Sequence, residues 1–160
     1  MSAAPPLDAR LAAAYQELIL DHYRRPRNRG PLPHPDAHAE LRNPLCGDEV
    51  AVALALDEAG RVREARFTGT GCSISQASAS MLTQLLAGKT VAEAARLGGR
   101  FARMLAGDAD AAADAALGDL RALAGVARLP MRVKCALLPW RALDEAVRGM
   151  GRRGGSGGPP

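Results

Sequence analysis

The spacing of apolar residues changes twice along this 160-residue chain, and each change marks a change of secondary structure. From Asp8 to Arg24 apolar side chains recur every three or four residues, which predicts an amphipathic helix that ends before Pro26. The segments 39–43, 49–56 and 62–68 are interpreted as strands, the second with apolar and small residues in alternation. A turn sequence joins the last two, so a hairpin is expected within a small antiparallel sheet.

Helical spacing returns after the glycine-rich loop 69–71, and a helix is expected from there to an exit at Gly88. Thr90 and Glu93 have the spacing of a capping box, so a further helix should begin at once. The Ala- and Asp-rich region 107–125 carries three leucines spaced for a short helix on the surface of the domain.

The last helical segment follows Pro130 and contains Pro139, which leaves two possible starts. If the helix begins near Leu138, the proline is harmless and Cys135 lies in the entry loop. If it begins near Met131, a kink should follow, because Pro139 has no N–H to donate to the carbonyl of Cys135.

Apolar residues make up 48% of the chain and aromatic residues only 3%, so the core must be built from small aliphatic side chains, which favours helical packing over a large sheet. The predicted fold class is α+β, with a small three-stranded antiparallel sheet packed against several α-helices. The length suits a single domain, expected at 7–148. Residues 1–6 are expected to be a flexible N-terminus and 149–160 a disordered Gly/Arg-rich tail.

The net charge of +4 is spread along the chain, and the one dense basic run lies between Arg24 and Arg29. With so few aromatic residues for base stacking, no nucleic-acid partner is expected. No stretch approaches the roughly 20 apolar residues of a membrane span, and the first residues lack the features of a secretory signal. The sequence therefore predicts a cytoplasmic protein with no membrane partner.

Three cysteines in a reducing compartment favour metal binding or thiol chemistry over a disulfide framework. Cys46 and Asp48 lie two apart where the chain enters a strand, so alternation should send both side chains to the same face. Cys72 lies at a predicted helix start, where the positive helix end favours a thiolate. Cys135 is far away in sequence and could join the others only through the fold.

Three thiolates and one carboxylate suit a tetrahedral zinc ion, and iron would also accept this set. Spacing alone supports the site weakly, because there is no CxxC pair. Each cysteine could instead be a buried packing residue, and Asp48 could be a turn residue or a helix cap.

The histidines offer a second set of candidate ligands or bases. His34 and His38 lie in a proline-rich segment, where a solvated role is expected. His22 falls on the packed face of the first helix and is interpreted as a hydrogen-bonded core histidine. No Ser-His-Asp or GxSxG arrangement is visible, so hydrolase chemistry has little support.

The local sequence around each cysteine resembles the SufU/IscU-like (NifU N-terminal-type) family of iron–sulfur cluster assembly proteins. The matching blocks stand in the family's order and cover about residues 15–148: Asp21-His22-Tyr23 with Pro26-Arg27-Asn28 and Gly30, Asn43-Pro44-Leu45-Cys46-Gly47-Asp48, Gly69-Thr70-Gly71-Cys72-Ser73-Ile74-Ser75 with Ala77 to Met81, and Arg132-Val133-Lys134-Cys135-Ala136 with Leu138 and Trp140. Lys134, where the scaffold branch usually has His, and the long stretch between Glu93 and Pro130 resemble the SufU branch.

The resemblance implies a SufE/IscU-like fold and a zinc ion held by Cys46, Asp48, Cys72 and Cys135. It implies a cysteine desulfurase partner (SufS-like), and other cluster assembly proteins as further partners. The expected activity is that of a zinc-dependent sulfurtransferase that takes persulfide sulfur from the desulfurase, with Cys46 as the acceptor.

The alternative function is a scaffold on which a [2Fe–2S] cluster is assembled on the same four ligands and transferred to apo-proteins. Iron or the cluster would then replace zinc. A third interpretation keeps the zinc as a structural clip in a binding module without sulfur chemistry.

Overall fold

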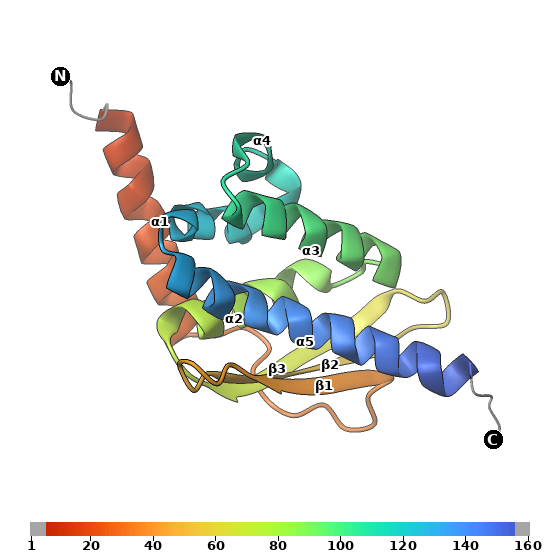
Figure 1. The fold of residues 1–160 in the computed structure, drawn as a ribbon. Helices are drawn as coiled ribbons and strands as arrows, with labels where there is room; N and C mark the ends of the chain where they lie inside the picture. Colours follow the sequence, from red (N-terminus) through yellow and green to blue (C-terminus); the bar gives the residue numbers. More distant parts are fainter. Residues whose placement is uncertain (1–5, 156–160) are drawn as a thin grey trace.

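A computed structural model of the chain describes residues 6–155. Its elements follow one another as a helix, three strands and a series of helices (Figure 1): α1 (Pro6–Arg24), β1 (Ala37–Arg42), β2 (Glu49–Leu56), β3 (Val62–Thr70), α2 (Ser73–Leu86), α3 (Val91–Leu105), α4 (Ala109–Ala112), the 3₁₀ segment η1 (Ala115–Arg128) and α5 (Pro130–Gly155). The predicted α+β class is confirmed.

The sheet is antiparallel, with the strands in the order β1-β2-β3. Val52 at its centre stands opposite Ala39 on one side and Phe67 on the other. Strand β3 runs to Thr70, so Gly69 belongs to the strand and not to the predicted loop. A Cβ at residue 69 would lie 2.3 Å from the carbonyl oxygen of Glu49, which explains the glycine inside a paired strand.

Helices cover one face of the sheet (Figure 1), where α5 packs on β1 and β2 and α2 packs on β3. A second helical layer of α3 and η1 lies beyond them, and α1 packs against α2 and η1. The core between the layers is aliphatic, as predicted. The few aromatic residues in it are themselves buried: Phe67, Phe101 and Trp140.

Region 107–125 differs from its prediction. It forms α4 and most of η1, and Gly118, at φ 54° and ψ −132°, breaks the regular backbone. Leu117, Leu120 and Leu123 are fully buried, so this region supplies core side chains and is not a surface helix. Three-residue spacing suits a 3₁₀ helix, in which such side chains line up on one face.

Helix α5 continues to Gly155, so the predicted start of the tail at residue 149 falls inside this helix. Residues 1–5 and 156–160 of the predicted flexible ends lie outside the described part of the chain. The domain boundaries at 7 and 148 stay a prediction. Within residues 6–155 no helix is both long and apolar enough to cross a lipid bilayer.

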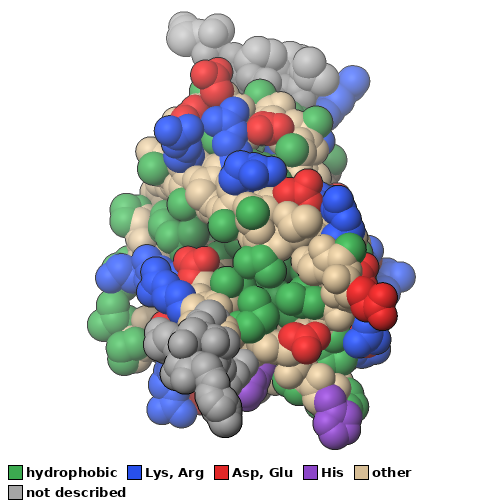
Figure 2. Space-filling view, turned by 90° about the vertical axis from the view of Figure 1, so that its right-hand side faces the viewer, with side chains coloured by type: hydrophobic (Ala, Val, Ile, Leu, Met, Phe, Trp, Pro, Cys, Tyr) green, Lys and Arg blue, Asp and Glu red, His purple; other side chains and the backbone are tan. Residues whose placement is uncertain are grey.

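Figure 2 shows the face of the molecule at the C-terminal end of α5. Apolar side chains gather near the middle of this face, among basic and acidic ones.

Candidate metal centre

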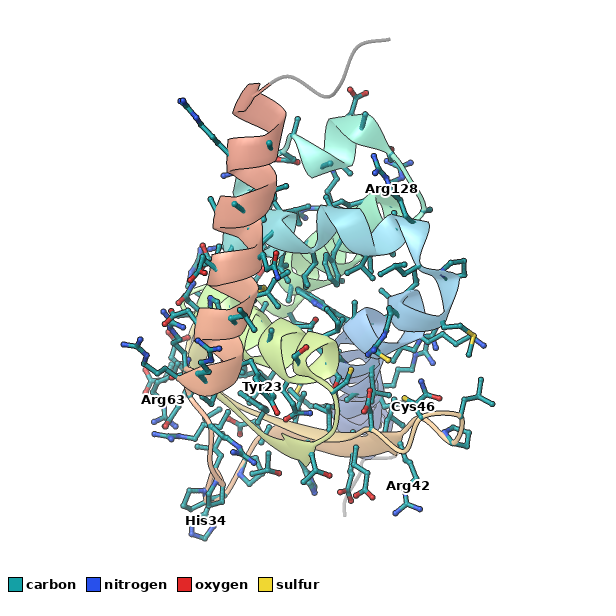
Figure 3. All side chains as sticks on the ribbon, turned by 90° about the vertical axis from the view of Figure 1, so that its left-hand side faces the viewer. Tyr23, His34, Arg42, Cys46, Arg63 and Arg128 are labelled. Carbon is teal, nitrogen blue, oxygen red and sulfur yellow. The ribbon has the colours of Figure 1, made fainter. Side chains whose placement is uncertain are left out.

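Three segments that are distant in sequence meet at one end of the sheet: the 43–48 turn before β2, the start of α2 and the second turn of α5. Each carries one of the three cysteines. Figure 3 shows Cys46 at this end, on the same face of the molecule as α1.

Cys46 lies in a turn and not in the extended strand entry that the sequence suggested. The N–H of Asn43 donates to the carbonyl of Asp48 at 2.8 Å, and the N–H of Gly47 donates to the carbonyl of Asn43 at 2.7 Å. The Asn43 side chain also accepts the N–H of Leu45 at 3.1 Å. Strand β2 begins only at Glu49, so the turn, and not strand alternation, places Cys46 and Asp48 in one group.

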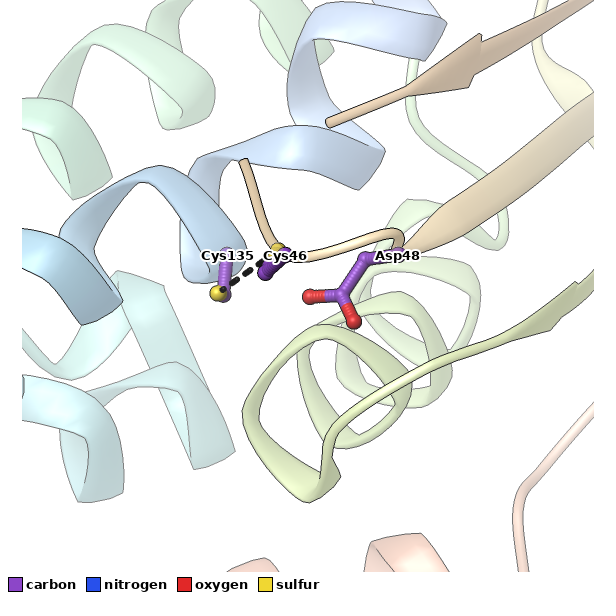
Figure 4. Close-up of side chains that lie close together, drawn as sticks. All are labelled: Cys46, Asp48 and Cys135. Carbon is purple, nitrogen blue, oxygen red and sulfur yellow. Dashed lines mark hydrogen bonds between the residues drawn. The ribbon is translucent and has the colours of Figure 1, made fainter. Parts of the chain in front are cut away.

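The ligand atoms of Cys46, Asp48 and Cys135 all lie within 4.8 Å of one another (Figure 4). The Sγ atoms of Cys46 and Cys135 are 3.7 Å apart. Two thiolates on one tetrahedral zinc ion, each about 2.3 Å from the metal, would be about 3.8 Å apart. The spacing of this pair therefore fits a shared zinc ion.

Cys72 lies outside this group of three mutually close ligands, and it contacts the Asp48 carboxylate. Its Sγ lies 3.3 Å from Asp48 Oδ2, and its backbone N–H donates to Asp48 Oδ1 at 2.9 Å. A thiolate and a carboxylate oxygen on one tetrahedral zinc ion would be about 3.6 Å apart. The structure thus brings all four predicted ligands to one place, where the Asp48 carboxylate accepts hydrogen bonds from all three thiols.

The start of α2 fixes this carboxylate. Cys72 occupies the N-cap position, and its side chain makes no capping hydrogen bond. Instead, the Asp48 carboxylate accepts a hydrogen bond from the backbone N–H of Cys72 at this helix end. The positive end of the helix dipole also favours the negative carboxylate there.

Burial and hydrogen bonds have opposite effects on the pKa of Asp48 and the same effect on the pKa of Cys135. Burial opposes ionisation of Asp48, but hydrogen bonds from the Cys72 N–H and from the thiols of Cys46, Cys135 and Cys72 outweigh it and lower the pKa of the carboxyl. Burial, together with the hydrogen bonds of its thiol to Asp48 and Cys46, raises the pKa of Cys135. In the metal-free centre the Cys135 thiol therefore keeps its proton beside an ionised carboxylate.

Cys135 is held inside α5. The helix starts at Pro130 and contains Pro139, so the earlier of the two possible starts is the observed one. The carbonyl of Cys135 has no helical donor at Pro139. One residue further on, the buried Ser78 hydroxyl of α2 donates to the carbonyl of Ala136 at 2.7 Å, which fixes this turn of α5 against α2.

The histidines lie away from the thiols, as expected. His22 is fully buried, and its Nδ1 and Nε2 lie 2.7 Å from Ser80 Oγ and 2.8 Å from Asp119 Oδ2. The Asp119 carboxylate can only accept, so Nε2–H donates to it, and in the neutral imidazole Nδ1 then accepts the Ser80 hydroxyl. His34 and His38 are exposed.

The His22 chain contains a Ser-His-Asp set that sequence inspection missed. Its members are 58 and 97 residues apart from His22, in elements whose packing could not be foreseen. Ser80 and His22 are both 0% exposed, so no substrate could reach the hydroxyl. The set ties α1, α2 and η1 together and gives hydrolase chemistry no support.

The donor set of three sulfurs and one oxygen fits zinc or iron, and it does not fit calcium or magnesium, which take oxygen ligands. Residues 14–136 match the family of NifU-like N-terminal domains. The chain is 43% identical over 141 residues to the zinc-dependent sulfurtransferase SufU of Bacillus subtilis (strain 168), covering 88% of this chain and 93% of that protein.

Two further similarities point the same way. The iron–sulfur cluster assembly scaffold protein IscU of Streptococcus pyogenes serotype M1 is 39% identical over 140 residues, covering 88% of this chain and 86% of that protein. A solved structure of a proposed iron–sulfur cluster assembly scaffold protein for the SUF system, from Fervidobacterium islandicum AW-1, is 33% identical, with a TM-score of 0.74 over 82% of this chain and 94% of that one. The chain therefore belongs to the SufU/IscU-like family of iron–sulfur cluster assembly proteins, with the fold of a NifU-like N-terminal domain.

Proposed function

We propose that this protein is a zinc-dependent sulfurtransferase that accepts persulfide sulfur from a cysteine desulfurase for iron–sulfur cluster assembly. The observation that carries the proposal is an exposed thiol, Cys46, 3.7 Å from a buried one, Cys135, beside a buried carboxylate. The similarity to a SufU protein named as a zinc-dependent sulfurtransferase supports it. We expect a SufS-like desulfurase in the cytoplasm as the partner.

Cys46, Asp48, Cys72 and Cys135 would hold the zinc. When bound, the ion would keep the cysteine thiols deprotonated at neutral pH. Coordination to the ion would also shield the nucleophilic sulfur until it is needed. Asp48 would be the one hard oxygen ligand. Its contacts with Cys72 support a second task, which is to hold the start of α2 against the centre.

Cys46 is the proposed sulfur acceptor because of its exposure. It is exposed on its turn, whereas Cys72 is half-buried and Cys135 is buried. The Cys46 thiolate attacks the outer sulfur of the desulfurase persulfide, and a new S–S bond forms on Cys46. The original S–S bond breaks, its electron pair remains on the desulfurase cysteine as a thiolate, and Cys46 carries the persulfide away.

The second candidate is a scaffold that builds a [2Fe–2S] cluster on the same four residues. The 39% identity to an IscU scaffold protein favours it, and the three sulfur donors suit iron as well as zinc. Here iron and sulfide are cargo, and the protein would release the finished cluster to apo-proteins.

The deciding measurement is desulfurase turnover with limiting amounts of the zinc-loaded protein, no iron, and a thiol reductant that reduces the Cys46 persulfide and releases its sulfur as sulfide. Multiple turnovers that are lost in Cys46→Ala identify a sulfur acceptor. Absence of stimulation, together with cluster absorbance after addition of iron and sulfide, would establish the scaffold instead.

Cys46→Ala also removes a zinc ligand, so Asp48→Ala serves as the matched variant. It removes a ligand and keeps all three thiols. We expect weaker zinc binding in both variants but residual sulfur acceptance, seen as persulfide on Cys46 by mass spectrometry, only in Asp48→Ala. Unchanged zinc affinity and unchanged sulfur acceptance in Asp48→Ala would refute the role given to Asp48.

A further inference from the structure

A buried hydroxyl lies beside one of the three thiols. The Oγ atom of Ser75, in the first turn of α2, is 3.9 Å from Cys72 Sγ and 3.1 Å from the carbonyl oxygen of Cys72. Ser75 is 0% exposed, so its hydroxyl is closed off from bulk water and must find its partners inside the protein.

The other two thiols have different neighbours. Cys46 Sγ contacts Cys135 Sγ at 3.7 Å and the Asp48 carboxylate. Cys135 Sγ also lies 3.9 Å from the carbonyl of Met131. Within residues 6–155 none of these neighbours carries a hydroxyl, so Ser75 distinguishes Cys72 from Cys46 and Cys135.

The surroundings of Ser75 decide where its single hydroxyl proton can go. Gln76 Nε2 donates to Ser75 Oγ at 3.2 Å, which fills an acceptor position of the hydroxyl. In the metal-free centre the Cys72 thiol donates to Asp48 at 3.3 Å, and the Ser75 hydroxyl donates to the Cys72 carbonyl. This carbonyl also accepts the backbone N–H of Gln76 at 3.2 Å. The hydroxyl can therefore turn away without leaving the carbonyl unpaired.

A bound metal ion changes the better acceptor. The Cys72 sulfur then has no proton and carries negative charge, and a hydrogen bond to a charged acceptor is stronger than one to a neutral carbonyl. We propose that Ser75 is a positioning residue whose hydroxyl donates to the Cys72 sulfur when the centre holds its metal. Gln76 orients and polarises this hydroxyl from the other side.

This hydrogen bond gives the thiols different tasks, a step that rests on the proposed function. A donated hydrogen bond draws electron density from a thiolate and makes it a weaker nucleophile, and such contacts also hold a metal ligand in place. Ser75 thus keeps Cys72 as a ligand and leaves the exposed Cys46 to accept the incoming sulfur.

The first test uses the cobalt-loaded protein without any desulfurase. Cobalt(II) accepts the same donor types as zinc and gives a sulfur-to-metal charge-transfer band. Ser75→Ala should move this band to lower energy, because a sulfur without its hydrogen bond gives up an electron more readily. Ser80→Ala is the matched control, since it also removes a fully buried hydroxyl from α2, one that contacts His22. It should lose stability and keep the wild-type band.

A wild-type band in Ser75→Ala, or the same shift in both variants, would overturn the proposal. So would the lack of a sulfur-to-cobalt band in the wild type. Gln76→Met removes the amide donor and keeps the length of the side chain, so we expect a smaller shift in the same direction. A wild-type band in Gln76→Met would refute the part given to Gln76.

The second test measures the nucleophilicity of each thiol in the zinc-loaded protein. Alkylation by iodoacetamide is followed at each cysteine by mass spectrometry. Cys72 should react about three- to tenfold faster in Ser75→Ala than in the wild type, while Cys46 keeps its rate. Ser80→Ala should match the wild type at both cysteines. Equal acceleration of Cys46 and Cys72 in Ser75→Ala would mean that the centre had opened, and the proposal would fail.

The desulfurase is added last, and the position of the persulfide is mapped by mass spectrometry. We expect the persulfide on Cys46 in the wild type and partly on Cys72 in Ser75→Ala. If the band and the alkylation rate change but no sulfur is transferred to the wild type, the Ser75 contact stands and the proposed function fails. If sulfur is transferred and Ser75→Ala matches the wild type in all three measurements, the function stands and the role of Ser75 is lost.

Discussion

Asp48 reaches the backbone at the start of α2 because residue 71 is a glycine. A Cβ at this position would lie 2.2 Å from Asp48 Oδ1 and 2.7 Å from its Cγ. Gly71 also has a φ of +147°, a conformation that L side chains rarely adopt. The contact between Asp48 and Cys72 therefore depends on the absence of one methyl group.

Gly71→Ala should weaken zinc binding and lower stability together. The methyl group would displace the carboxylate, and the backbone strain should cost about 1–3 kcal/mol of unfolding free energy. Zinc affinity is measured by chelator competition and stability by urea unfolding of the metal-free protein. The matched control is Gly60→Ala, at a turn with φ +81° and no atom within 4 Å of the added Cβ. It should lose stability from strain and keep wild-type zinc affinity; similar zinc affinity in both variants would contradict the role of Gly71.

At the scale of elements, the sequence predicted what local periodicity determines. The three strands and the Thr90–Glu93 capping box are present as expected. The sequence predicted a strand entry at Cys46, where the structure has a turn. Hydrogen bonds to and from Asn43 hold this turn, and the alternation of apolar and small residues does not reveal them. The burial of Leu117 also escaped prediction, since it depends on the packing of η1 against α3.

The packing of α3 on α5 depends on a second glycine. A Cβ at Gly98 would lie 2.9 Å from Cε3 of the buried Trp140, whose ring centroid is 5.8 Å from that of Phe101. Gly98→Ala should destabilise the protein although alanine favours helix, because the indole would have to shift in a close-packed core. Gly99→Ala adds the same methyl group in open space on the next residue and should stabilise by up to about 1 kcal/mol. Urea unfolding compares the two; stabilisation by both substitutions would show that Trp140 moves without cost.

At the scale of the whole molecule, the candidate centre is a long-range structure. Cys46 and Cys135 are 89 residues apart, and Cys72 and Asp48 are 24 apart. The residue types of the centre could be read from the sequence because sulfur and carboxylate donors suit few metals. Their convergence was implied only by the family resemblance, because residue spacing does not show that α2 and α5 pack on the same sheet. The buried His22 chain escaped for the same reason, because Ser80 and Asp119 meet it only after α1 packs against α2 and η1.

Because the proposed zinc ligands come from three separate segments, zinc binding should stabilise the whole fold. An ion that binds only the folded state at 100 times its dissociation constant adds about 2.7 kcal/mol. For a domain of this size that corresponds to a rise of roughly 5–10 °C in unfolding temperature. Removal of zinc with a chelator should lower the unfolding temperature of the wild type by this amount, and Cys135→Ala should show little response to zinc.

The size of this zinc effect should depend on pH in a defined direction. Burial and hydrogen bonds raise the pKa of Cys135, so its proton must leave before the sulfur can bind a metal. Protons therefore compete with zinc, and the zinc-dependent rise in unfolding temperature should shrink as the pH falls. Calorimetric scans at several pH values, with and without chelator, measure it. An increment that is constant with pH would mean that zinc binds without displacing thiol protons, and the ligand set proposed here would be wrong.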